Sequence, residues 1–110
     1  MTTITLAKVE TALAYLAETD KEYARSKADI EYSKHLAKVA HAQAYEASRE
    51  STAAGKSASA TLSGGYGDAM IRIRDCIYDY ELIRAKRLRA ELTIDVWRSV
   101  NSARNKGQIV

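Results

Sequence analysis

The apolar positions in the first half of the chain predict helix, with a boundary near residues 18–20. Four apolar residues follow a 3-4-3 spacing that places them on one side of a helix, namely Leu6, Val9, Leu13 and Leu16. This stripe weakens where Thr19-Asp20-Lys21-Glu22 matches a capping box, a pattern that begins a new helix. We therefore expect a break or a kink near residues 18–20, between a helix at about residues 3–18 and a longer one at about 20–52.

Glycine and serine mark the one predicted loop. Residues 53–67 contain four of the five glycines together with several serines, which is typical of a loop. Asp68 can cap a final helix at about residues 68–104, and Gly107 would follow the end of that helix. The prediction is an all-α fold of long antiparallel helices in one domain, residues 1–110: a helical hairpin that can include a short N-terminal helix.

The final helix is apolar on two sides. One stripe consists of Ile71, Tyr78, Leu82, Ala85, Leu92, Val96 and Ala103, with Asp75, Arg89 and Ser99 interrupting it. The other consists of Ile73, Cys76, Tyr80, Ile83, Ala90, Ile94 and Trp97, with Arg87 interrupting it. Because a two-helix hairpin covers only one side, the other side needs a further helix, from residues 5–18 or from a neighbouring subunit. We expect a homo-oligomeric bundle whose interface is made by Ile73, Tyr80, Ile83, Ile94 and Trp97.

Composition agrees with long, closely packed helices. Hydrophobic residues make up 46% of the 110 residues, but 19 of them are alanines, which fill little core volume, and proline is absent. The single cysteine excludes an internal disulfide framework. The apolar runs are too short to cross a membrane, and the first residues lack the parts of a secretory signal. We therefore expect a cytoplasmic protein without a membrane partner.

No group of residues typical of catalysis stands out. Ala54-Gly55-Lys56-Ser57 resembles the end of a phosphate-binding loop, but Glu50 stands where that motif requires glycine. His35 and His41 lie six residues apart, which is not the helical spacing that brings two ligands to one metal. We expect a protein that is not an enzyme and has no metal site or cofactor.

Charge is uneven along the chain. The net charge is +3, and residues 66–110 hold the excess, with nine basic and six acidic side chains. Arg84, Arg87 and Arg98 lie close together on a helical wheel, and Arg104 and Lys106 extend the row. Such a ridge could follow a phosphate backbone. The alternative is a solvated face, because Glu81, Glu91 and Asp95 are placed for ion pairs within the helix.

Two stretches resemble proteins of phage recombination. Tyr32-Ser33-Lys34-His35-Leu36-Ala37-Lys38 resembles the Tyr-Ser-Lys-x-Leu-x-Lys run of the UvsY family of recombination mediators. Residues 99–109 are similar to the basic, glycine-containing tail of that family. Residues 92–99, Leu-Thr-Ile-Asp-Val-Trp-Arg-Ser, are similar to a run in small proteins of temperate-phage recombination modules.

The resemblance implies a helical oligomer in the bacterial host cytoplasm that binds single-stranded DNA without sequence specificity. Such a protein helps a recombinase displace single-strand-binding protein. At the matching positions, Lys34, Lys38, Arg104 and Lys106 would contact phosphates; Arg98 follows from the second resemblance, and Arg84 and Arg87 from the ridge. The alternative function is a helical oligomeric adaptor that binds protein partners and no nucleic acid. The basic tail favours the first function, and the balanced charge elsewhere favours the second.

Overall fold

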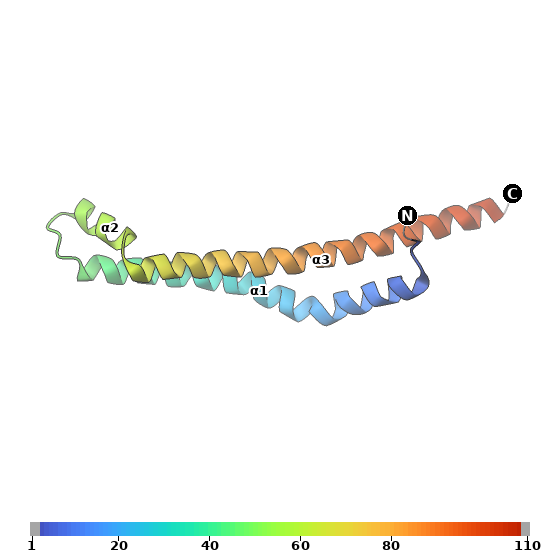
Figure 1. Ribbon diagram of the computed structural model, residues 1–110, viewed down its shortest axis with the longest axis horizontal. Helices are drawn as coiled ribbons and strands as arrows, with labels where there is room; N and C mark the ends of the chain where they lie inside the picture. The colour runs from blue at the N-terminus through green and yellow to red at the C-terminus, as the bar shows by residue number, and fades with distance from the viewer. Residues whose placement is uncertain (1–2, 109–110) are drawn as a thin grey trace. The chain divides into compact units, whose positions relative to one another are not determined.

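The structure, a computed structural model that describes residues 3–108, contains only helices and turns in that range, and this confirms the predicted all-α fold (Figure 1). α1 spans Leu6–Ala47, α2 spans Ala53–Thr61 and α3 spans Gly64–Gln108. The long helix α1 packs against the long helix α3, as expected for a helical hairpin.

α1 continues through residues 18–20, where the sequence pattern predicted a boundary. Thr19 does not cap a new helix, because its hydroxyl donates a hydrogen bond of 2.7 Å to the carbonyl of Tyr15, one turn earlier. A threonine that bonds back onto the preceding turn is compatible with a continuous helix, although such a bond often bends the helix slightly. The predicted division into helices at 3–18 and 20–52 is therefore wrong, and α1 ends earlier, at Ala47.

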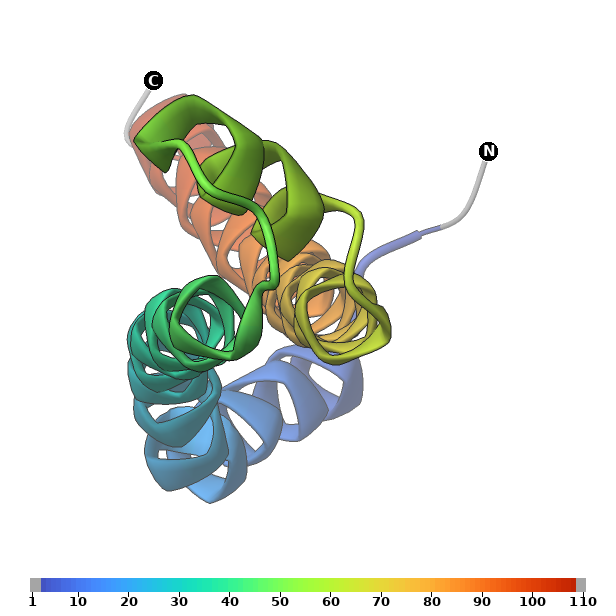
Figure 2. The same ribbon diagram turned by 90° about the vertical axis from the view of Figure 1, so that its left-hand side faces the viewer.

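The predicted loop at 53–67 contains the short helix α2. Thr52 begins this helix, since its hydroxyl oxygen accepts a 2.9 Å hydrogen bond from the backbone amide of Gly55. Ala60 is completely buried, so α2 is held by a close alanine contact. Figures 1 and 2 show α2 beside the adjoining ends of α1 and α3.

α3 begins at Gly64, a full turn before the predicted start. Ser63 caps it: the hydroxyl oxygen accepts from the amide of Tyr66 at 3.3 Å, and the carbonyl accepts from the amide of Gly67 at 3.0 Å. Asp68, the expected cap, lies inside the helix. α3 also continues to Gln108 instead of ending at residue 104.

The chain forms two compact units, which we describe separately. The first unit joins the chain up to Tyr23 with the chain from Glu81 onward, and the second unit is Ala24–Tyr80. The core of the first unit consists of Val9, Ala12, Ala90 and Ile94, with Ile4, Tyr15, Leu16 and Trp97 packed against it. The prediction of a single domain over residues 1–110 stays a prediction.

Two of the three buried residues of α1 in the second unit have small side chains. Its buried positions on α1 are Ile30, Ser33 and Ala37. The hydroxyl of Ser33 lies 3.4 Å from the sulfur of Cys76 on α3, a weak polar contact between the two helices. Small side chains let two helices approach closely, so this unit has a thin core.

Two leucines of the predicted α1 stripe do not face α3. Leu6 is 56% exposed and Leu13 is 50% exposed, whereas Val9 is buried and Leu16 is half-buried. Val9, Ala12, Leu16 and Thr19 alternate at spacings of three and four residues. The inward face therefore follows a heptad pattern that includes Ala12 and Thr19 and excludes Leu6 and Leu13.

Candidate functional site

Arg87 was predicted to contact phosphate, and the structure places it inside the first unit instead. Its side chain is only 15% exposed. The guanidinium donates to the carbonyl of Leu16 at 2.9 Å, to the hydroxyl of Thr19 at 2.8 Å and to the carboxylate of Asp20 at 2.8 Å. Its central carbon lies 4.9 Å from the centre of the Tyr23 ring, a cation–π contact. The donors of Arg87 are directed at α1, and its predicted contact with phosphate stays a prediction.

The other described members of the predicted α3 ridge are exposed, but acidic residues lie beside or between them. Arg84 pairs with Glu81 at 3.3 Å, and both side chains are more than half exposed. Glu91 lies midway between Arg84 and Arg98, seven residues from each and thus on the same side of α3. Arg98 and Arg104 are exposed, and neither has an ion pair among the described residues, whereas the side chain of Lys106 lies outside what the structure describes.

Lys34 and Lys38 lie together in the second unit. They line a groove of about 570 Å³ that also includes Glu31, His35 and His41. Lys34 pairs with Glu31 at 3.4 Å, so an acid already occupies part of this groove. Exposed pairs of this kind are worth about 0.3–0.5 kcal/mol and leave the lysine available to other partners.

Tyr66 is half-buried in the second unit. Its ring lies 5.2 Å from that of His41 in an edge-to-face arrangement. His41 also lies 3.3 Å from the hydroxyl of Thr61 on α2. These contacts give Tyr66 and His41 a packing role where α1, α2 and α3 meet.

The residues predicted to form an oligomer interface lie on the side of α3 that faces α1. We call this side the inner stripe: Ile73, Cys76, Tyr80, Ile83, Ala90, Ile94 and Trp97. Ile94 is buried in the core of the first unit, with Trp97 packed against it. Ile73, Tyr80 and Ile83 are half-buried. The predicted interface residues therefore serve the fold of a single chain.

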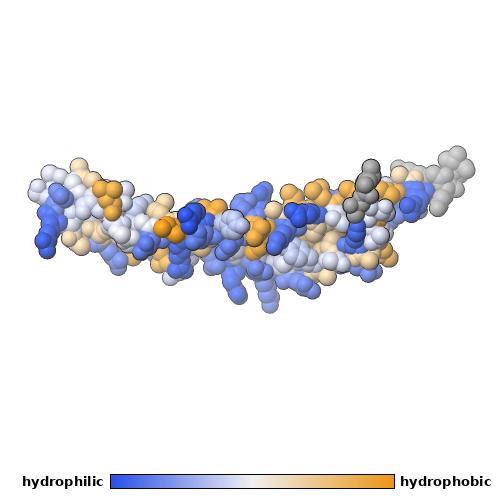
Figure 3. Space-filling model, viewed as in Figure 1, coloured by the Kyte–Doolittle hydropathy of each residue, from blue (hydrophilic) through white to orange (hydrophobic). Residues whose placement is uncertain are grey.

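The other side of α3 is exposed. In the first unit we call it the outer stripe: Leu82, Ala85, Leu92, Val96 and Ala103. Its large members are 42–55% exposed. Leu88 and Val100, beside the stripe, are exposed to a similar extent. Figure 3 shows apolar residues gathered along the C-terminal half of α3 between charged ones. The sequence identified both stripes, but it gave no signal for which of them would face α1.

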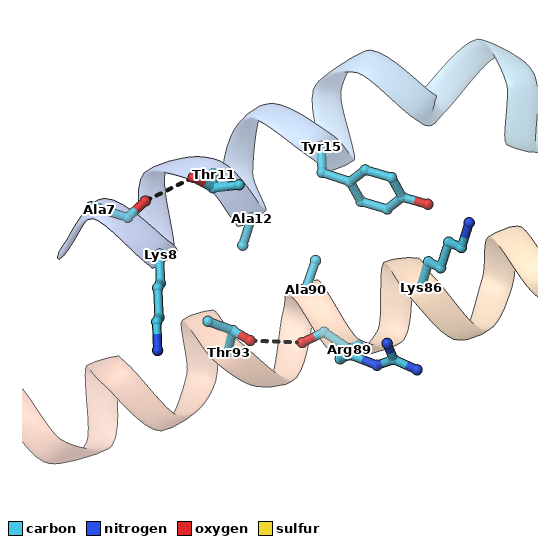
Figure 4. Close-up of a pocket in the computed structure, with 9 residues that line it drawn as sticks. All are labelled: Ala7, Lys8, Thr11, Ala12, Tyr15, Lys86, Arg89, Ala90 and Thr93. Carbon is cyan, nitrogen blue, oxygen red and sulfur yellow. Dashed lines mark hydrogen bonds between the residues drawn. The ribbon is translucent and has the colours of Figure 1, made fainter. Parts of the chain in front are cut away.

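A groove in the first unit was missed by the sequence analysis. It has a volume of about 580 Å³ and lies between facing stretches of α1 and α3 (Figure 4). Its lining consists of Ala7, Lys8, Thr11, Ala12, Tyr15, Lys86, Arg89, Ala90 and Thr93. Three of these residues are cationic, and none of the described residues that line it is acidic. On α1 and on α3 the lining residues are spaced so that they lie on one side of the helix. Only the packing of the two helices brings the two sets together.

The described residues contain no group of three or more His, Cys, Asp or Glu side chains placed to hold a metal. Within the same range, none of the helices has a stretch apolar enough to span a bilayer. No protein family, curated protein or solved structure is found to match this chain. The resemblance to UvsY-like mediators therefore stays a prediction.

Proposed function

We propose that this protein is a helical assembly protein that forms a homo-oligomer and contacts protein partners through the outer stripe of α3. The exposure of that stripe supports the proposal. Single exposed leucines are ordinary on protein surfaces. Leu82, Leu92 and Val96, however, recur at heptad spacing along one side of one helix, which is the pattern of a helix–helix interface.

The test is the oligomeric state of a stripe variant, measured by sedimentation equilibrium. Leu92→Glu with Val96→Glu should convert the oligomer to a monomer, because both side chains would bring charge into the buried interface. A matched control, Ala14→Glu with Ala17→Glu, adds the same charges at exposed positions of α1 and should remain oligomeric. A monomeric wild-type protein, or a stripe variant that still assembles, would overturn the proposal.

A second candidate function is binding of single-stranded DNA as an accessory factor of a recombinase or a single-strand-binding protein, in the cytoplasm of a bacterial host. Two exposed arginines without an acidic partner among the described residues, Arg98 and Arg104, favour it. Lys34, Lys38 and Lys106 would add phosphate contacts. Acidic residues accompany several of the predicted contacts, Glu31 beside Lys34 and Glu91 between Arg84 and Arg98, which makes this the weaker candidate.

Fluorescence anisotropy with labelled oligo(dT) tests this second function. Binding through phosphates should weaken steeply between about 50 and about 200 mM salt. Arg98→Glu with Arg104→Glu should abolish it and leave the oligomer intact. Absence of binding at the lower salt concentration would eliminate this candidate.

A further inference from the structure

The groove of the first unit has a floor of small side chains. Ala7, Ala12 and Ala90 contribute only methyl groups. Thr11 and Thr93 have their hydroxyls bonded to their own helices, donating to the carbonyls of Ala7 at 2.9 Å and Arg89 at 3.0 Å (Figure 4). Both hydroxyls are therefore engaged before any ligand arrives, and the floor offers a partner mainly apolar contact.

The rim of the groove is cationic. Lys86 and Arg89 have no ion pair among the described residues. The ammonium of Lys8 donates to the backbone carbonyl of Thr3 at 3.0 Å, which leaves its charge without an acidic partner in the described range. A ligand that fills this groove thus meets an apolar floor and positive charge along its edges, and carboxylates on the ligand would complement that charge.

The shape of the groove matches a helix. On α3 it extends from Lys86 to Thr93, which corresponds to a length of about 10 Å, or two helical turns. An amphipathic helix that lies in a groove between two helices inserts apolar residues at positions i, i+3 or i+4, and i+7. The volume of about 580 Å³ is enough for two or three such side chains.

Nucleic acid fits the same groove less well. Binding of single strands relies on several aromatic rings on which successive bases stack. Tyr15 is the one aromatic residue among the described residues of the lining. We propose that this groove binds an acidic amphipathic helix of a protein partner, with apolar side chains on the alanine floor and carboxylates against Lys8, Lys86 and Arg89. This inference goes beyond the proposed assembly function: it adds a second surface, distinct in its residues from the outer stripe, and the chemistry of the partner that binds there.

The probe is a labelled synthetic helix of three heptads, with leucine at positions a and d, glutamate at e and g, and alanine elsewhere. Its matched control carries lysine in place of glutamate. By fluorescence anisotropy, the acidic peptide should bind at least ten times more tightly than the basic one. Equal affinity for the two peptides would overturn the proposal, and so would oligo(dT) that displaces the acidic peptide, because the groove would then take phosphates.

Charge-reversal variants locate the contact. Lys8→Glu with Lys86→Glu should weaken binding of the acidic peptide more than tenfold. The control, Lys21→Glu with Lys27→Glu, makes the same change in net charge at exposed α1 positions outside the groove, and it should bind normally. Equal loss in both variants would show attraction by net charge alone and overturn the proposal.

The outer-stripe variant separates this inference from the proposed function. Leu92→Gln with Val96→Gln, which places no acid one turn from Arg89, should abolish self-association and leave peptide binding unchanged, because neither residue lines the groove. Loss of peptide binding in this variant, with binding retained in Lys8→Glu with Lys86→Glu, would place the peptide on the outer stripe and overturn the groove site.

Discussion

Replacing Arg87 by alanine should destabilise the first unit far more than the removal of any other arginine on α3. The change removes hydrogen bonds to the carbonyl of Leu16 and the hydroxyl of Thr19, an ion pair with Asp20 and the contact with the Tyr23 ring. Each of the two hydrogen bonds from the charged guanidinium to a neutral acceptor is worth about 1.5 kcal/mol. The cation–π contact adds about 0.5 kcal/mol.

The net effect is smaller than the sum of these contributions. The carboxylate of Asp20 is 66% exposed, so its ion pair contributes only about 0.5 kcal/mol. The Arg87 side chain is only 15% exposed, so the guanidinium loses most of its hydration on folding. This desolvation opposes part of the stabilisation that its contacts provide. Because the four contacts belong to one group and are not additive, we expect Arg87→Ala to lower the free energy of unfolding by about 2–3 kcal/mol.

Urea unfolding followed by Trp97 fluorescence measures this loss, since Trp97 packs against the core of the same unit. Arg84→Ala is the matched control: it removes an exposed i,i+3 pair and should cost about 0.3 kcal/mol. Arg87→Lys keeps the charge but has no planar fork to reach three acceptors, and it should recover less than half of the loss. If Arg87→Ala costs no more than Arg84→Ala, the reasoning fails.

Two further pairs of substitutions test the assignment of the stripes and the start of α2. Ile94→Ala should lower the free energy of unfolding by about 3 kcal/mol, because it leaves a cavity in the core. Leu92→Ala, at a position that is 55% exposed, should lower it by under about 1 kcal/mol in the unassembled protein. Equal effects in urea unfolding would contradict the assignment of inner and outer sides. Thr52→Ala removes the cap of α2, which is worth about 1 kcal/mol, and should speed amide hydrogen exchange in α2 about fivefold. The control Ser51→Ala should leave exchange unchanged. If Thr52→Ala does not affect exchange, the cap contributes nothing to the stability of α2.

The helical class and the two stripes of α3 could be predicted from the sequence because hydrophobic periodicity alone determines them. The choice of the inward stripe could not. Both stripes are similar in apolar content, and the choice depends on the complementary face of α1, which is made of small and polar residues such as Ala12, Thr19 and Ser33. A search for large apolar residues on α1 selects Leu6 and Leu13 together with Val9 and Leu16, although the two first-named leucines are exposed.

Arg87 illustrates the same limit for the candidate site. Its charge and the other basic residues near it in the sequence suggest a surface position, although it stands within an apolar stripe. Its burial depends on partners more than sixty residues away in the chain, Thr19 and Asp20. The groove was missed for a related reason: Lys8 belongs to α1, whereas Lys86 and Arg89 belong to α3, and no spacing along the chain connects them.

The contacts of Arg87 also fix the register of the two helices. A hairpin with a face rich in alanine could slide by one heptad and still bury methyl groups. In the two slipped alignments, however, Arg87 would face Leu13 or Lys27 in place of Asp20, Ala12 or Ser26 in place of Thr19, and Leu16 or Ile30 in place of Tyr23. In either slipped alignment the buried guanidinium of Arg87 would lose several of its hydrogen-bond acceptors. This loss would lower the stability of that alignment by several kcal/mol. One polar layer thus selects a single alignment that the apolar residues alone leave open.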